Sequence, residues 1–126
     1  MAAWVAQGLD GLTSNVLSCA AADRDGEDVR PSRDWSTDQW RAAAEALADR
    51  GLVAIDAAGV IVPTDAGRAV HAAVEATTDE LAAASYHALA PAELASLRDR
   101  LRSIATVVAA SGALRYPNPI GLPPVA

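Results

Sequence analysis

The chain has 126 residues, of which 52% are hydrophobic and 4% aromatic, and its formal net charge is -6. This length corresponds to one domain, since domains usually contain roughly 100 to 200 residues. All 10 basic residues are arginines, set against 16 acids, which excludes a generally basic nucleic-acid-binding surface and a polybasic membrane anchor.

The only cysteine of the sequence, Cys19, excludes an internal disulfide and a cysteine-rich zinc site. No apolar run reaches the roughly 18 residues of a membrane-spanning helix, and no basic-then-apolar signal pattern opens the sequence. These features predict a cytoplasmic protein that folds around its own core without a disulfide, a metal ion or a cofactor.

Residues 3–22 are predicted to form one helix, because apolar side chains recur along them at helical spacing. Gly8 and Gly11 each cost this helix about 1 kcal/mol relative to alanine, and we expect another helix that crosses close to them to offset this cost. Residues 23–34 mix charged side chains with a glycine and a proline and contain almost nothing apolar to bury. We expect them to form an exposed, mobile loop.

The clearest local signal is the start of a helix at Ser36. Ser36 and Gln39 are spaced as the N-cap and N3 residues of a capping box, and Trp35 and Trp40 are spaced as a hydrophobic staple. We therefore expect Trp40 to be buried. Gly51 is placed to end this helix in a left-handed conformation.

Two short β-branched segments, 52–55 and 60–62, flank turn-forming residues and predict a small β-hairpin. Thr64 is then placed to cap a second long helix. Side chains that share one direction on this helix form its expected inner face: Val70, Val74, Thr77, Leu81 and Ala84.

A third long helix is predicted to begin at Pro91 and end at Gly112. Its apolar side chains follow the spacing 3, 4, 3, 4, which is typical of a heptad seam: Leu94, Leu97, Leu101, Ile104 and Val108. The proline-rich residues 115–126 predict an extended tail. Together these elements predict a mainly α, winged-helix-like domain with a small two-stranded β-hairpin over residues 1–114.

The order of elements over residues 36–88 resembles the second half of a winged helix-turn-helix of the MarR type. The resemblance depends on Arg50-Gly51-Leu52 and on Pro63-Thr64-Asp65-Ala66-Gly67-Arg68. In that family the first motif ends the DNA-recognition helix and leads into the β-wing, and the second opens a long helix. Proline stands at position 63, where leucine is usual.

Nearly the whole chain is similar to the C-terminal half of an uncharacterised actinobacterial family of winged-helix-like proteins. The matching segments are Gly8–Leu12, Trp35–Trp40, Arg50–Leu52, Glu75–Ala82 and Tyr116–Leu122. Members of that family usually carry a helical N-terminal half of similar size, and the 126 residues resemble the other half alone. The resemblance therefore implies a separate helical subunit as one candidate partner.

The helix that follows Ser36 is the candidate DNA-reading element, with Thr37, Gln39 and Arg41 on its first exposed turns. Glutamine and arginine are suited to contact the edges of adenine and guanine. Three acids share its outer surface: Asp38, Glu45 and Asp49. The predicted wing offers no arginine for phosphate contacts, of which DNA binding requires several. This charge pattern favours a winged helix used for packing over one that reads DNA.

A metal site and a nucleophile are the other chemical candidates. His71, Glu75 and Asp79 are spaced four residues apart on one helical face, but that face lies opposite the apolar stripe and beside Arg68. We therefore expect an ordinary solvated face and no bound metal. Cys19 lies in an apolar helix and is expected to be a core residue, and we predict no catalytic residues.

The stripe from Leu94 to Val108 is either an internal core face or a subunit seam, because MarR-type proteins dimerise through their terminal helices. The tail adds Tyr116, Ile120 and Leu122 as apolar side chains that need cover. We predict a non-enzymatic binding or assembly module that forms a homodimer or pairs with a separate helical subunit. Two alternatives stay open, a MarR-like DNA-binding regulator and a subunit of an enzyme whose active site is completed by a helical half.

Overall fold

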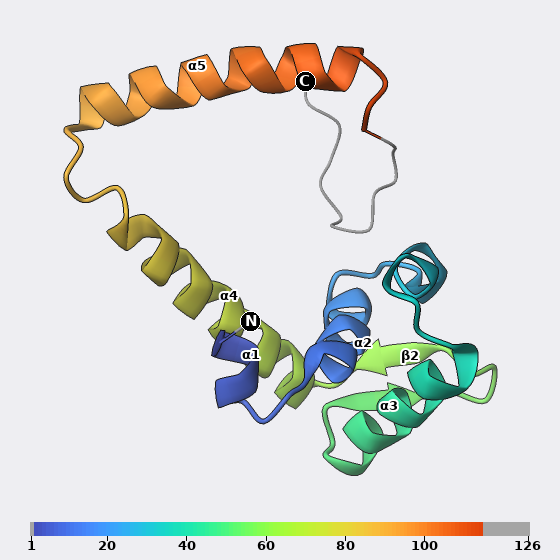
Figure 1. The fold of residues 1–126 in the computed structure, drawn as a ribbon. Coiled ribbons are helices and arrows are strands. Elements are labelled where there is room, and N and C mark those ends of the chain that lie inside the picture. Colours follow the sequence, from blue (N-terminus) through green and yellow to red (C-terminus); the bar gives the residue numbers. More distant parts are fainter. Residues whose placement is uncertain (1, 115–126) are drawn as a thin grey trace. The chain divides into compact units, whose positions relative to one another are not determined.

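The computed structural model describes residues 2–114 (Figure 1). The chain divides into two compact units, Met1–Thr78 and Asp79–Ala126. The single domain expected over residues 1–114 stays a prediction, and the extended tail expected over residues 115–126 lies outside the described residues. None of the helices in the described part of the chain is both long and apolar enough to cross a bilayer.

The first predicted helix is two helices, α1 (Ala2–Ala6) and α2 (Gly11–Ala21). The backbone turns at Gly8, whose φ of +68° is left-handed, and Asp10 then caps α2 by accepting hydrogen bonds from the backbone N–H groups of Leu12 and Thr13 at 3.1 and 2.8 Å. The expected close helix crossing is wrong for Gly11, because nothing lies within 4 Å of the place its Cβ would take.

Residues 23–34 contain two short 3₁₀ helices, η1 (Gly26–Asp28) and η2 (Pro31–Arg33). The exposed loop that the sequence predicts is wrong for Val29, which lies between these two helices and is 2% exposed. One buried aliphatic side chain thus attaches this charged segment to the core. The high average polarity of the segment conceals that contact from a sequence reading.

Helix α3 (Thr37–Asp49) begins as predicted with a capping box. The Oγ of Ser36 accepts a hydrogen bond from the backbone N–H of Gln39 at 3.1 Å, and the Oε1 of Gln39 accepts one from the backbone N–H of Ser36 at 2.9 Å. The burial of Trp40 is confirmed, since its exposed fraction is 8%. Gly51 follows the helix with a φ of +69°, as expected for a left-handed helix end.

Strands β1 (Val53–Ile55) and β2 (Ile61–Pro63) form the predicted antiparallel hairpin, with Ala54 opposite Val62. Helix α2 packs against α3 and β2, and α3 also packs against β1. The buried side chains of these elements form one core: Leu9, Val16, Leu17, Cys19, Val29, Trp40, Ala43, Ala44, Leu47, Leu52 and Val53. This mainly α arrangement with a two-stranded hairpin confirms the winged-helix-like fold.

Helix α4 (Asp65–Ala84) begins at the predicted cap. The Oγ1 of Thr64 accepts a hydrogen bond from the backbone N–H of Gly67 at 3.1 Å and donates one to the carbonyl of Gly51 at 2.7 Å. The predicted inner face of α4 is confirmed at Val74, which is 1% exposed, and is wrong at Leu81, which is 64% exposed. Thr77 and Ala84 are exposed too.

Helix α5 (Pro91–Ala110) belongs to the second unit. A side chain of its first turn caps it: the Oε2 of Glu93 accepts a hydrogen bond from the backbone N–H of Ala90, the N-cap residue, at 2.8 Å. Gly112 ends it with a φ of +74°, as predicted. None of the residues of α5 is buried.

Candidate functional site

The predicted DNA-reading residues lie on the first turns of α3, and all three are exposed: Thr37, Gln39 and Arg41. The side chain of Gln39 is committed to the capping box through its Oε1. One guanidinium nitrogen of Arg41 lies 3.6 Å from a carboxylate oxygen of Asp38, one turn earlier on the same helix. Two of the three candidate readers therefore already have intrahelical partners. Their role in DNA recognition stays a prediction.

Carboxylates dominate the exposed surface of α3 and the hairpin. Four exposed acids lie there, against the exposed Arg41 and Arg50: Asp38, Glu45, Asp49 and Asp56. The guanidinium of Arg50 donates hydrogen bonds to the carbonyls of Gly8 and Gln7, both at 2.9 Å. Arg50 thus connects the end of α3 to the turn between α1 and α2. This surface therefore carries a net negative charge, whereas DNA-binding proteins normally neutralise several phosphates with basic side chains.

The tip of the hairpin is closed by Asp56. Its Oδ1 accepts hydrogen bonds from the backbone N–H groups of Ala58 and Val60, both at 2.8 Å, which is the arrangement of an Asx turn. No basic residue occurs in the hairpin. Three of its large apolar side chains are instead exposed, since Ile55 is 39%, Val60 53% and Val62 43% exposed. The wing is therefore an apolar element with an acidic tip.

A groove of about 370 Å³ separates the hairpin from the first three turns of α3. Its lining combines aliphatic and aromatic side chains with one acid and one arginine: Thr37, Trp40, Arg41, Ala44, Glu45, Ile55, Gly59 and Ile61. We call this the α3–hairpin groove. The sequence does not predict this groove, because the groove forms between two elements whose relative placement the sequence does not specify.

A second hollow, of about 440 Å³, adjoins α2 and the segment 23–27. Cys19 lines it and is 3% exposed, and burial raises the pKa of its thiol. Its burial confirms Cys19 as a core residue. A raised pKa favours the protonated thiol, which is weakly nucleophilic. The Nε of Arg24 is buried there without a hydrogen-bond partner in the described part of the chain.

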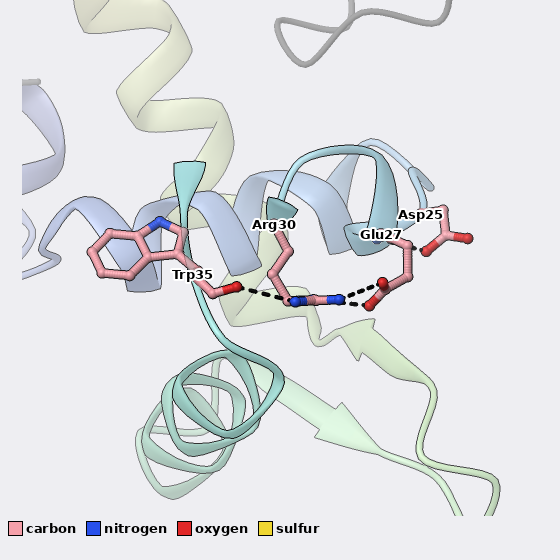
Figure 2. A network of polar contacts seen from close by, with 4 residues as sticks. All are labelled: Asp25, Glu27, Arg30 and Trp35. Carbon is pink, nitrogen blue, oxygen red and sulfur yellow. Dashed lines mark hydrogen bonds and ion pairs between the residues drawn. The ribbon is translucent and has the colours of Figure 1, made fainter. Parts of the chain in front are cut away.

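Beside that hollow, Arg30 organises a polar network (Figure 2). Its guanidinium donates to both carboxylate oxygens of Glu27, at 3.0 and 2.6 Å, and to the carbonyl of Trp35 at 3.0 Å. The bonded Arg30 lowers the pKa of the Glu27 carboxyl, and Glu27 raises the pKa of Arg30. Asp25 accepts a hydrogen bond from the backbone N–H of Glu27 at 2.9 Å. The network fixes the polypeptide that leads into α3, which is a structural role.

Of the three residues considered for a metal site, Glu75 and Asp79 are exposed. His71 is half-buried, and its ring centroid lies 5.8 Å from that of Trp4, with the ring planes tilted by 57°. The prediction that His71 lies on a solvated face is therefore wrong. Among residues 2–114, no group of three His, Cys, Asp or Glu side chains is close enough together to hold a metal ion.

The predicted interface stripe follows α5. Leu94, Leu101, Ile104 and Val108 are 42%, 54%, 61% and 41% exposed, and Leu97 is half-buried. Val107, next to the stripe, is 71% exposed. The remaining predicted interface residues lie outside the described residues: Tyr116, Ile120 and Leu122. Both interpretations of the stripe, an internal core face and a subunit seam, stay predictions.

Comparison with known proteins adds one match. The sequence profile of a helix-turn-helix family matches residues 1–115. No curated protein matches the chain, and no solved structure matches it. The matched residues include α2, α3, the hairpin and α4, which are the elements of the winged-helix-like fold described above. The chain belongs to this helix-turn-helix family.

Proposed function

We propose that this protein is a non-enzymatic assembly module, in which a winged-helix-like unit is joined to a helix that pairs with its counterpart in a second copy. The observation that carries the proposal is the apolar stripe of α5. Four of its side chains are more than 40% exposed: Leu94, Leu101, Ile104 and Val108. Exposing aliphatic side chains costs about 25 cal/mol per Å² of apolar surface.

The spacing of the stripe supports a helical partner over other covers. Positions 94, 97, 101, 104 and 108 follow a 3, 4, 3, 4 repeat, which keeps one seam facing a neighbouring helix over several turns. At 1.5 Å per residue this seam is about 21 Å long. A second copy supplies an identical seam, and two-fold dimers are the commonest form of association among soluble proteins. We therefore assign the stripe to a homodimer interface.

Charge substitutions in the seam test this assignment. We expect Leu101→Glu and Ile104→Glu to convert the dimer to a monomer, because each places a carboxylate in an apolar contact. Leu81→Glu is the matched control, since Leu81 is an exposed leucine of α4 outside the stripe. Light scattering after size exclusion measures the mass of each variant. Equal masses for Leu101→Glu, Leu81→Glu and the unmodified protein would contradict the proposal.

A MarR-like DNA-binding regulator is the second candidate, and family membership favours it. In that case α3 reads the major groove and the hairpin contacts the flanking backbone. The four acids on the α3 and hairpin surface argue against it, as does the absence of a basic residue from the hairpin. A gel shift whose strength falls with salt would favour the regulator, because phosphate contacts release counterions.

A further inference from the structure

The α3–hairpin groove has an apolar interior within the first unit. Trp40 and Ala44 close its bottom and are 8% and 2% exposed. Ile61 lines it half-buried, and Ile55 forms a wall that is 39% exposed. A volume of about 370 Å³ is near the lower end of ligand pockets, which span roughly 300 to 1,000 Å³. It suits one or two large side chains.

The rim of the groove is acidic. Glu45 lines it directly, Asp38 lies on the first turn of α3, and Asp56 closes the hairpin beside Ile55. The one arginine of the lining, Arg41, lies 3.6 Å from Asp38, so these two charges offset each other, and Glu45 and Asp56 give the rim its net negative charge. The groove therefore combines an apolar bottom with a negative edge. This combination attracts a ligand that is apolar at its centre and basic at its ends.

We propose that the α3–hairpin groove docks a segment of a partner protein that carries a bulky apolar side chain flanked by lysines or arginines. The apolar side chain enters between α3 and the hairpin and is removed from water by Trp40, Ile55 and Ile61. The flanking cations lie near Glu45 and Asp56.

The charge of the site selects a basic peptide over DNA. A duplex brings a dense row of phosphates to the same surface and meets carboxylates there, whereas DNA readout requires cationic side chains. A winged helix in this form uses its recognition helix and wing to hold protein. The inference does not depend on pairing through α5, because every residue of the groove belongs to the first unit.

Titration with defined peptides tests the proposal. The probes are three fluorescein-labelled synthetic peptides of equal length: one of lysine and leucine, one of lysine and alanine, and one of glutamate and leucine. We expect the lysine and leucine peptide to bind at least about tenfold more tightly than the other two, because it alone has both the anchor and the charge. Fluorescence anisotropy measures the affinities, and amide chemical shifts should move in α3 and the hairpin.

Two variants locate the binding site. Glu45→Arg removes the acid of the lining, and Ile55→Asp places a charge on the apolar wall; each should weaken binding of the lysine and leucine peptide by about tenfold. Glu80→Arg is the matched control, since it makes the same change in net charge at an exposed position of α4 outside the groove. Ile55→Ala replaces Ile55→Asp if the charged variant fails to give the circular dichroism of the folded protein.

Three results would overturn the proposal. The first is an equal loss of affinity in Glu45→Arg and Glu80→Arg, which would reflect net charge alone. The second is equal binding of all three peptides. The third is duplex DNA that shifts the same α3 and hairpin amides at lower concentration than the peptide. A monomeric protein that binds the peptide at the groove would overturn the proposed homodimer and leave this inference standing.

Discussion

The backbone of Gly67 on α4 lies against the main-chain carbonyl of Leu52, so closely that a methyl group at position 67 would overlap the carbonyl oxygen. The same carbonyl accepts a hydrogen bond from the backbone N–H of Thr64 at 3.1 Å. The start of α4 is thus fixed against the residue that precedes β1. This contact explains why glycine stands in the first turn of a helix, where alanine has the higher intrinsic propensity.

We predict that Gly67→Ala destabilises the protein by about 1 to 3 kcal/mol, the usual cost of inserting a methyl group into a close contact. Urea unfolding followed by circular dichroism measures the change. Gly11→Ala is the control, because Gly11 also lies in the first turn of a helix and has open space around it. That variant should unfold at the same urea concentration as the unmodified protein or a higher one. A stabilised Gly67→Ala would show that α4 does not approach Leu52 as described.

The start of α3 supports a second prediction. Ser36→Ala should destabilise the fold by about 1 kcal/mol, because it removes the acceptor for the backbone N–H of Gln39. Trp40→Ala should cost about 3 kcal/mol or more, because a large side chain that is 8% exposed leaves a cavity in the core. Denaturant unfolding followed at 222 nm (far-UV circular dichroism) gives both values. A Trp40→Ala protein as stable as the unmodified one would contradict the assigned inner face of α3.

Acid should remove part of the stability that Asp10 provides. Hydrogen bonds from the hydroxyl and the backbone N–H of Thr13, and from the backbone N–H of Leu12, lower the pKa of the Asp10 carboxyl below its ordinary value. A carboxyl whose pKa is lower in the folded state stabilises the fold above its unfolded pKa, near 4. That contribution is lost as the pH falls through the folded pKa.

We therefore expect the difference in unfolding free energy between the unmodified protein and Asp10→Asn to be largest near neutral pH. It should shrink steadily as the pH falls below about 4. Thr13→Val removes the hydroxyl donor and should reduce this pH dependence, while a hydroxyl-bearing Thr13→Ser should retain it. A difference that stays constant with pH would show that Asp10 is not hydrogen-bonded as a carboxylate at the start of α2.

Duplex DNA should bind poorly. With the acids of α3 and Asp56 on the same surface, we expect random duplex DNA to bind more weakly than about 100 μM at physiological salt, at or beyond the weak limit of ordinary non-specific binding. A gel shift over a range of salt concentrations measures this. A shifted band at low-micromolar protein that disappears as salt is raised would support the regulator instead.

Local signals in the sequence predicted the helix starts and ends well where one or two side chains determine them. The capping box at Ser36, the left-handed Gly51, the cap at Thr64 and the start at Pro91 are each specified by residues within one helical turn. The short hairpin differed from its expected limits by about one residue, as is usual for element ends. The fold class followed from the order of these elements.

The predictions that were wrong concern positions where tertiary contacts, or two competing local signals, determine the structure. Apolar spacing alone predicted one helix through Gly8, although the Asp10 and Thr13 capping pair specifies a new start. Val29 is buried within a charged segment, which no average over that segment reveals. The partners of Gly67 and His71, namely Leu52 and Trp4, are distant in sequence. The α3–hairpin groove likewise requires the packing of two elements.

Sedimentation equilibrium over a range of protein concentrations tests the homodimer most directly. We expect a mass of twice 12.9 kDa at about 100 μM, a concentration at which a micromolar dissociation constant gives almost complete pairing. Dilution should shift the fitted mass toward that of one chain. A single species of 12.9 kDa at about 100 μM, unchanged by dilution, would contradict pairing through α5.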